Sequence, residues 1–187
     1  SSTLLAVGLV FLPFGTHSLQ AQIWTGNGSD TNWSTIENWD PALPVDGNAV
    51  SFPEIPETGT PGTTNQNLTD LRLSSLTVES SATDGWTLGG LDLNIHAGNT
   101  ATTLFSTGAT GNTINNNLRF TSNSSLSLGT VSGRISSSVG NVLTINGNLS
   151  NGSSARFLGG GEVRLTGSVT VANSSSNDSF ILDGTTA

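Results

Sequence analysis

The chain has 187 residues, with 13 acidic against five basic side chains, a formal net charge of −8 at pH 7 and no cysteine. An acidic surface repels phosphate groups, which argues against partnership with nucleic acid or with anionic membrane surfaces. The absence of cysteine excludes disulfides and thiolate metal sites.

Hydrophobic residues make up only 34% of the chain, below the usual ~45–50%. They are not scattered, however, but recur as short runs of Leu, Val, Ile and Phe between Gly, Asn and Ser. That pattern is typical of many short strands rather than of disorder. We therefore expect one all-β domain with a terminal appendage.

Residues 1–21 have the character of a secretory signal peptide. LLAVGLVFL at 4–12 is uncharged and apolar, and a polar segment ending in Ala21 follows it, as in the core and cleavage region of such peptides. Nine apolar residues are too few to span a bilayer, so we expect no membrane insertion by this chain; a buried strand or helix is the alternative. A basic start and a Met are missing, which predicts a truncated N-terminus.

Residues 22–64 are expected to form an N-terminal cap and a Pro-rich loop. Trp24, Trp33 and Trp39 stand close together among short polar residues. Exposed rings of this kind could stack on sugars, which makes these three residues the candidate ligand-binding residues. They could equally cover the open end of a stack of strands, where apolar core and unpaired edges are otherwise exposed, and each would bury ~150–250 Å². We prefer the cap.

The turns around Asp30 and Asp46 lack the ligand spacing of a calcium loop. We expect these two carboxylates to accept hydrogen bonds from backbone amides, and we expect neither a metal nor a cofactor.

Residues 65–187 contain strand-like pieces with alternating apolar residues, which predict one buried and one solvated face. The pieces are 71–78, 86–95, 102–105, 118–120, 125–131, 142–149, 163–171 and 180–182. Asn112, Asn115–Asn117 and Asn146 are expected at turns, where Asn tolerates left-handed geometry.

Two pairs of pieces repeat with an offset of 20 residues: Leu143 and Ile145 match Val163 and Leu165, and Leu71–Leu73 matches Leu91–Leu93. Repeats of this length favour stacked coils that bury their apolar residues against one another. The same offset predicts Arg72 beside Asp92 on adjacent strands. It also places Gly147 and Gly167 at corners, where we expect a positive φ. A β-sandwich with short strands is the structural alternative.

GGGEVRLTGSVTV resembles the autotransporter-associated β-strand repeat, with matches at Gly159, Gly161, Val163, Leu165 and Gly167. GNVLTING at 140–147 is a looser match. The opening stretch is similar to the segment that begins many exported bacterial proteins with these repeats, through Trp24, Asn32-Trp33, Asn38-Trp39, Pro44, Asp46-Gly47 and Val50-Ser-Phe52. The resemblance implies a right-handed parallel β-helix (a solenoid) displayed outside a Gram-negative-type cell. FILDGTTA at the C-terminus predicts a repeat region that is truncated there.

No constellation for catalysis stands out. His96 is expected to be a solvated surface residue, since a Ser-His-Asp site needs a positioned histidine. Asp70, Asp92, Glu79 and Asp84 could cluster with Arg72 as in a β-helical polysaccharide lyase, but a solvated acidic face is the preferred interpretation. We therefore expect no enzyme and no catalytic residues.

The sequence thus predicts a secreted, surface-displayed β-helical repeat protein with a structural or adhesive role. Its partners would be polysaccharide, extracellular matrix or other cell surfaces. A carbohydrate-active β-helix of the lyase kind and a carbohydrate-binding module are the alternatives.

Overall fold

The structure is a computed structural model that describes residues 21–54, 62–96, 103–121, 133–152, 155–171 and 180–183. The described part is essentially all β, with one short 3-10 turn, η1 (Ile36–Asn38). It contains no helix long and apolar enough to cross a membrane. The predicted signal peptide and the predicted strand at 125–131 lie outside the described residues, apart from Ala21.

The strands form three open sheets, here named A, B and C. Sheet A has the spatial order β2 (Trp39–Asp40), β1 (Gln22–Trp24), β3 (Ala49–Phe52), β6 (Ser75–Ser80), β9 (Leu104–Gly108), β12 (Gly133–Ser137), β15 (Ala155–Leu158) and β18 (Phe180–Asp183). Sheet B contains β4 (Thr63–Gln66), β7 (Thr87–Gly90), β10 (Gly111–Ile114), β13 (Val142–Ile145) and β16 (Glu162–Leu165). Sheet C contains β5 (Arg72–Leu73), β8 (Leu93–His96), β11 (Leu118–Thr121), β14 (Leu149–Asn151) and β17 (Val169–Val171).

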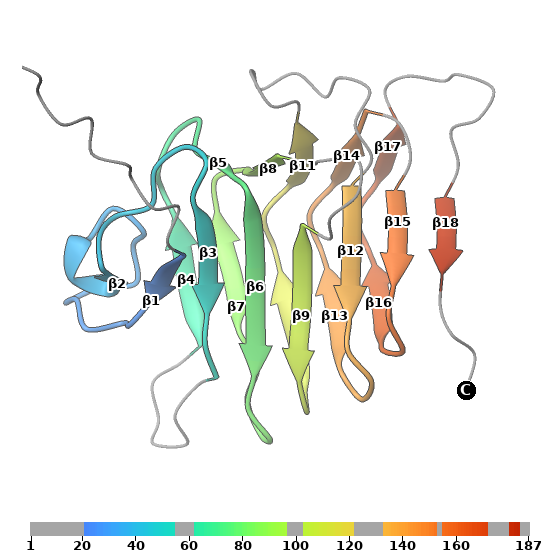
Figure 1. Ribbon diagram of the computed structural model, residues 1–187, viewed down its shortest axis with the longest axis horizontal. Helices are drawn as coiled ribbons and strands as arrows, with labels where there is room; N and C mark the ends of the chain where they lie inside the picture. Colours follow the sequence, from blue (N-terminus) through green and yellow to red (C-terminus); the bar gives the residue numbers. More distant parts are fainter. Residues whose placement is uncertain are drawn as a thin grey trace, which may run out of the picture.

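From β3 onward the chain visits the sheets in the fixed order A, B, C and then returns to sheet A. Figure 1 shows the strands of sheet A side by side along the long axis, from β1 near one end to β18 at the other. Every described pairing is parallel except that of β1 with β2. The core lies between the sheets because each strand turns alternate residues inward, as period-two geometry requires.

One column of inward residues shows how this core is built. Leu88, Ile114 and Ile145 lie side by side on β7, β10 and β13, and all three are fully buried. Leu, Ile and Val suit these positions because their branched side chains fill a pleated, half-buried surface.

The predicted 20-residue register is confirmed for one of the two repeats. Leu143 pairs with Val163, and Ile145 with Leu165. The other register is wrong: Arg72 lies opposite Asn94, an offset of 94 − 72 = 22. The repeat is longer than 20 residues here. Gln66 already pairs with Gly90 in sheet B, an offset of 90 − 66 = 24, and the corner between sheets B and C then shortens by two residues, which leaves the offset of 22 in sheet C.

Gly147 and Gly167 do lie at the corners between sheets B and C, but neither has the positive φ that we expected. A Cβ on Gly147 would collide with the backbone carbonyl of Asn116, and one on Gly167 with that of Gly147. These positions need glycine because successive corners approach closely, and not because of backbone conformation.

Candidate functional site

Trp24, Trp33 and Trp39 are all buried, with exposed fractions of 5%, 0% and 5%. Trp39 contacts the other two indoles edge-on, at centroid distances of 5.0 and 5.3 Å. All three surround Phe52, at 5.4 to 5.9 Å. These four residues are called the tryptophan cluster below.

Two of the three indole N–H groups of the cluster donate hydrogen bonds within the protein. Trp33 Nε1 donates to Thr64 Oγ1 at 3.0 Å, and Trp39 Nε1 donates to the Trp33 carbonyl at 2.8 Å. Buried indoles usually find such partners. The rings therefore face one another rather than water, and ligand binding by Trp24, Trp33 and Trp39 stays a prediction.

The two turn carboxylates behave as predicted. Asp30 accepts hydrogen bonds from the Asn32 amide N–H at 3.0 Å and from Thr35 Oγ1 at 2.7 Å. These bonds, that of Thr35 foremost, lower the pKa of Asp30 because they stabilise the ionised form. Asp46 accepts from the Arg72 amide at 3.0 Å and also forms an ion pair with the Arg72 guanidinium. Arg72 is thus paired with Asp46, and the predicted contact with Asp92 is wrong.

The predicted acidic constellation is only partly brought together. Asp70 and Asp92 line one cavity of about 390 Å³ at the corner between sheets B and C. Glu79 instead lies on β6 of sheet A, and Asp84 lies in the link that follows, where it accepts from Thr83 Oγ1 at 2.8 Å. Arg119, which the sequence did not single out, lines the same cavity as Asp70 and Asp92.

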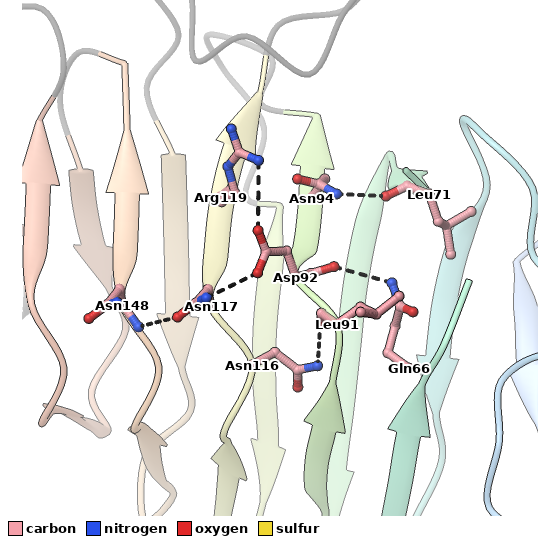
Figure 2. A network of polar contacts seen from close by, with 9 residues as sticks. All are labelled: Gln66, Leu71, Leu91, Asp92, Asn94, Asn116, Asn117, Arg119 and Asn148. Carbon is pink, nitrogen blue, oxygen red and sulfur yellow. Dashed lines mark hydrogen bonds and ion pairs between the residues drawn. The ribbon is translucent and has the colours of Figure 1, made fainter. Parts of the chain in front are cut away.

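This corner cavity is lined by eight residues: Leu68, Thr69, Asp70, Gly90, Leu91, Asp92, Asn94 and Arg119. Asp92 stands at the centre of a network of polar contacts (Figure 2). Its carboxylate accepts from Asn117 Nδ2 at 3.0 Å and lies 3.7 Å from an Arg119 guanidinium nitrogen. Its backbone carbonyl accepts from Gln66 Nε2 at 3.1 Å.

Two side-chain carbonyl oxygens near the cavity lack a hydrogen-bond partner, those of Asn94 and Asn116. Both residues are buried, and their amide nitrogens donate to the carbonyls of Leu71 and Leu91 at 3.3 and 2.7 Å (Figure 2). The cavity thus combines carboxylate acceptors, a guanidinium donor and the half-exposed Leu91 side chain. Such a mixed wall suits a polyhydroxylated ligand, which presents both hydroxyl groups and apolar C–H groups.

A row of short polar side chains continues from Asp92 along the corner. Asn117 Oδ1 accepts from the backbone N–H of Asn148 at 3.1 Å (Figure 2). Asn148 Oδ1 in turn accepts from the backbone N–H of Ser168 at 3.0 Å. A parallel row runs through Asn115, Asn146 and Thr166, with side-chain hydrogen bonds of 2.8 Å each. The signal for this corner ladder is in the sequence: the triplets Asn115–Asn117, 146–148 and 166–168 each precede the first inward residue of a sheet C strand.

His96 ends β8 and lines a smaller cavity of about 200 Å³ with Asp46, Gly47 and Arg72. Its Nδ1 is buried without a hydrogen-bond partner. His96 thus lies at the surface as expected, but its ring is only partly exposed and Nδ1 is not solvated. Within the described ranges, no group of three or more His, Cys, Asp or Glu is arranged to hold a metal ion.

Comparison of the chain with protein-family models, with curated proteins and with solved structures finds no match. Its function is therefore inferred from its residues and their geometry.

Proposed function

We propose that the strands form a right-handed parallel β-helix whose N-terminal end is capped by the tryptophan cluster. The fixed A, B, C order of the strands supports this proposal, because each set of three strands then makes one coil. The parallel pairing also favours it over the β-sandwich alternative, whose strands pair mainly in antiparallel fashion.

The proposed role of this β-helix is structural or adhesive. It would be exported, displayed on the surface of a Gram-negative-type cell and non-enzymatic, with polysaccharide, extracellular matrix or another cell surface as its partner. The observation that carries this proposal is the corner ladder, in which uncharged amides and hydroxyls bond from coil to coil. A long face of neutral hydrogen-bonding groups can make many weak contacts with an extended partner, and such contacts add up by multivalency.

A carbohydrate-active β-helix is the second candidate, and the corner cavity is the observation that favours it. Asp70, Asp92 and Arg119 converge there. However, Asp92 is already bonded to Asn117 and paired with Arg119, as in a structural network. We therefore rank binding above catalysis. A carbohydrate-binding module is the third candidate, and it would need exposed tryptophan faces, whereas Trp24, Trp33 and Trp39 are buried.

One experiment separates these functions. The full chain would be produced in a Gram-negative host and tested for retention on immobilised neutral and anionic polysaccharides, with reducing ends and unsaturated uronates measured in the same samples. Retention without new chain ends is the expected result. New chain ends that disappear in Asp92→Asn but not in Asp84→Asn, a carboxylate outside the cavity, would contradict the adhesive role and support catalysis.

A further inference from the structure

The outer surface of sheet B presents one threonine on each of four successive strands. Thr63 pairs with Thr87, Thr87 with Thr113, and Thr113 with Thr144. The next residue on each strand points into the core and is buried: Thr64, Leu88, Ile114 and Ile145. The threonines therefore point outward and repeat at the strand spacing of about 4.7–4.9 Å, a row of about 14 Å.

A second outward row lies two residues further along the chain, on β4 and β7 and directly after the ends of β10 and β13. It contains Asn65, Gly89, Asn115 and Asn146. The two rows together are called the threonine face below. Because this row is made of amides and a glycine, it carries no charge.

The hydroxyls of the threonine row are uncommitted. Within the described part of the chain, Thr87, Thr113 and Thr144 have no side-chain hydrogen-bond partner, although all three are partly exposed. Each hydroxyl can both donate and accept a hydrogen bond. The row thus offers a regular series of free donors and acceptors.

Charge begins only beyond the borders of this face. At one end Asp30 shares a small cavity with Thr63. At the other end Glu162 and Arg164 on β16 satisfy each other, with Arg164 Nε 2.5 Å from Glu162 Oε1. The net charge of −8 would repel an anionic polymer. The face itself carries no carboxylate to attract a cationic one.

We propose that the threonine face binds an extended, unbranched polysaccharide of neutral sugars. This inference rests on the proposed function and specifies its surface and its ligand class. Sugar hydroxyls match the free threonine hydroxyls, sugar C–H groups match the threonine methyls, and a periodic polymer can engage several strands at once. A protein partner fits less well, because the centre of a protein interface is enriched in aromatic residues, Met and Arg, and this face has none of them.

The test is affinity electrophoresis of the full chain in gels that contain hydroxyethylcellulose or the unbranched mixed-linkage β-1,3-1,4-glucan, with alginate as the anionic polymer. The variant Thr87→Val/Thr113→Val/Thr144→Val removes three hydroxyls but keeps the β-branched shape and the strand preference. The matched control is Ser51→Ala/Thr77→Val/Ser136→Ala on the outer face of sheet A, where these residues are also partly exposed. Circular dichroism confirms that both variants are folded.

We expect the neutral polymers to retard the wild type and the control equally. We expect the threonine variant to bind at least tenfold more weakly, and alginate to retard none of the three. Equal binding by all three proteins, equal weakening by both variants, or retardation by alginate alone would overturn the threonine face but leave the adhesive role standing. Failure of the wild type to bind any polymer, in the gels and in the retention experiment, would overturn both proposals.

Discussion

The two ends of the sheets differ in what covers their inward side chains. At the N-terminal end, Trp24, Trp33 and Trp39 close over Phe52, which is fully buried. Near the other end, Val163 and Leu165 on β16 are only partly buried, although they occupy the same columns as the fully buried Leu143 and Ile145.

This difference shows that an inward aliphatic residue is completely buried only when side chains cover it from both sides. In the middle of sheet B the neighbouring strands supply that cover. At the N-terminal end the tryptophan cluster supplies it instead, with three large rings, two of which lie on β1 and β2. The importance of a residue for stability should therefore depend on its position along the stack as much as on its type.

The largest effect is expected at the tryptophan cluster. Trp33→Ala removes a fully buried indole and should lower the free energy of unfolding by about 3–5 kcal/mol. Urea unfolding followed by far-UV circular dichroism measures this loss. Ile36→Ala, at a side chain that is 56% exposed, should change stability little. If the two variants lost similar amounts, the cluster would not be the cover that we describe.

A second prediction compares two leucines of the same column in sheet B, Leu88 on β7 and Leu165 on β16. Leu88→Ala removes a fully buried side chain and should cost about 2–5 kcal/mol. Leu165→Ala removes a partly buried one and should cost less than about 2 kcal/mol, since less apolar surface is lost. Denaturant midpoints with unchanged slopes would measure both. Equal losses would mean that residue type, not position, decides the cost.

Sequence reasoning predicted local patterns well where the corners have equal length. The pairs Leu143–Val163 and Ile145–Leu165 follow directly from the 20-residue offset. The pair of Arg72 with Asp92 failed because the offset between neighbouring strands is 24 residues in sheet B and 22 in sheet C at this level, and not 20. A local repeat carries no information about such insertions, so the partner of Arg72 was found only in three dimensions.

Other elements were missed because their own sequences are weak strand signals. β10, β12 and β15 read GNTI, GRISS and ARFL, with few apolar residues in alternation. Each of these three strands forms because a parallel neighbour hydrogen-bonds to it on both sides. Asn112 was expected at a left-handed turn but lies buried on β10, where its Nδ2 donates to Ser106 Oγ at 3.0 Å. The position of Arg119 in the corner cavity likewise depends on strand pairing, because the register of β11 with β8 places it opposite Asn94.

The third prediction compares two asparagines, one at each end. Asn38 is fully buried one residue before Trp39. Its side-chain oxygen accepts from the Gly28 N–H at 2.8 Å, and its Nδ2 donates to two backbone carbonyls at 3.0 Å each. Asn38→Ala leaves these groups unsatisfied and should cost about 1–3 kcal/mol. Asn148→Ala removes an exposed bond to the Ser168 amide and should cost about 0.5–1 kcal/mol, because water replaces it. Thermal unfolding of both variants measures the difference, and a larger loss in Asn148→Ala would contradict it.

The smallest effect concerns the two carboxylates whose pKa is lowered, Asp30 near the cluster and Glu162 on β16. Neutral hydrogen bonds, first that of Thr35, lower the pKa of Asp30 below its usual 3.8, whereas the Arg164 guanidinium lowers the pKa of Glu162 below its usual 4.5. A lowered folded-state pKa stabilises the fold above the usual pKa, and this contribution is lost as the pH falls through the folded value. Both contributions therefore disappear below about pH 4, and both are small because the groups are exposed.

Salt distinguishes these two carboxylates. It screens an exposed ion pair but not a hydrogen bond between a carboxylate and a neutral hydroxyl. In carboxyl-carbon NMR titrations at low and at 1 M salt, we expect the pKa of Glu162 to return toward 4.5 while that of Asp30 stays low. Thr35→Val should raise the pKa of Asp30 equally at both salt concentrations, and Arg164→Gln should raise that of Glu162 more at low salt than at 1 M salt. If the pKa of Asp30 were as salt-sensitive as that of Glu162, charge rather than the hydrogen bonds of the turn would lower it. The two ends of the sheets would then not differ in how their carboxylates are stabilised.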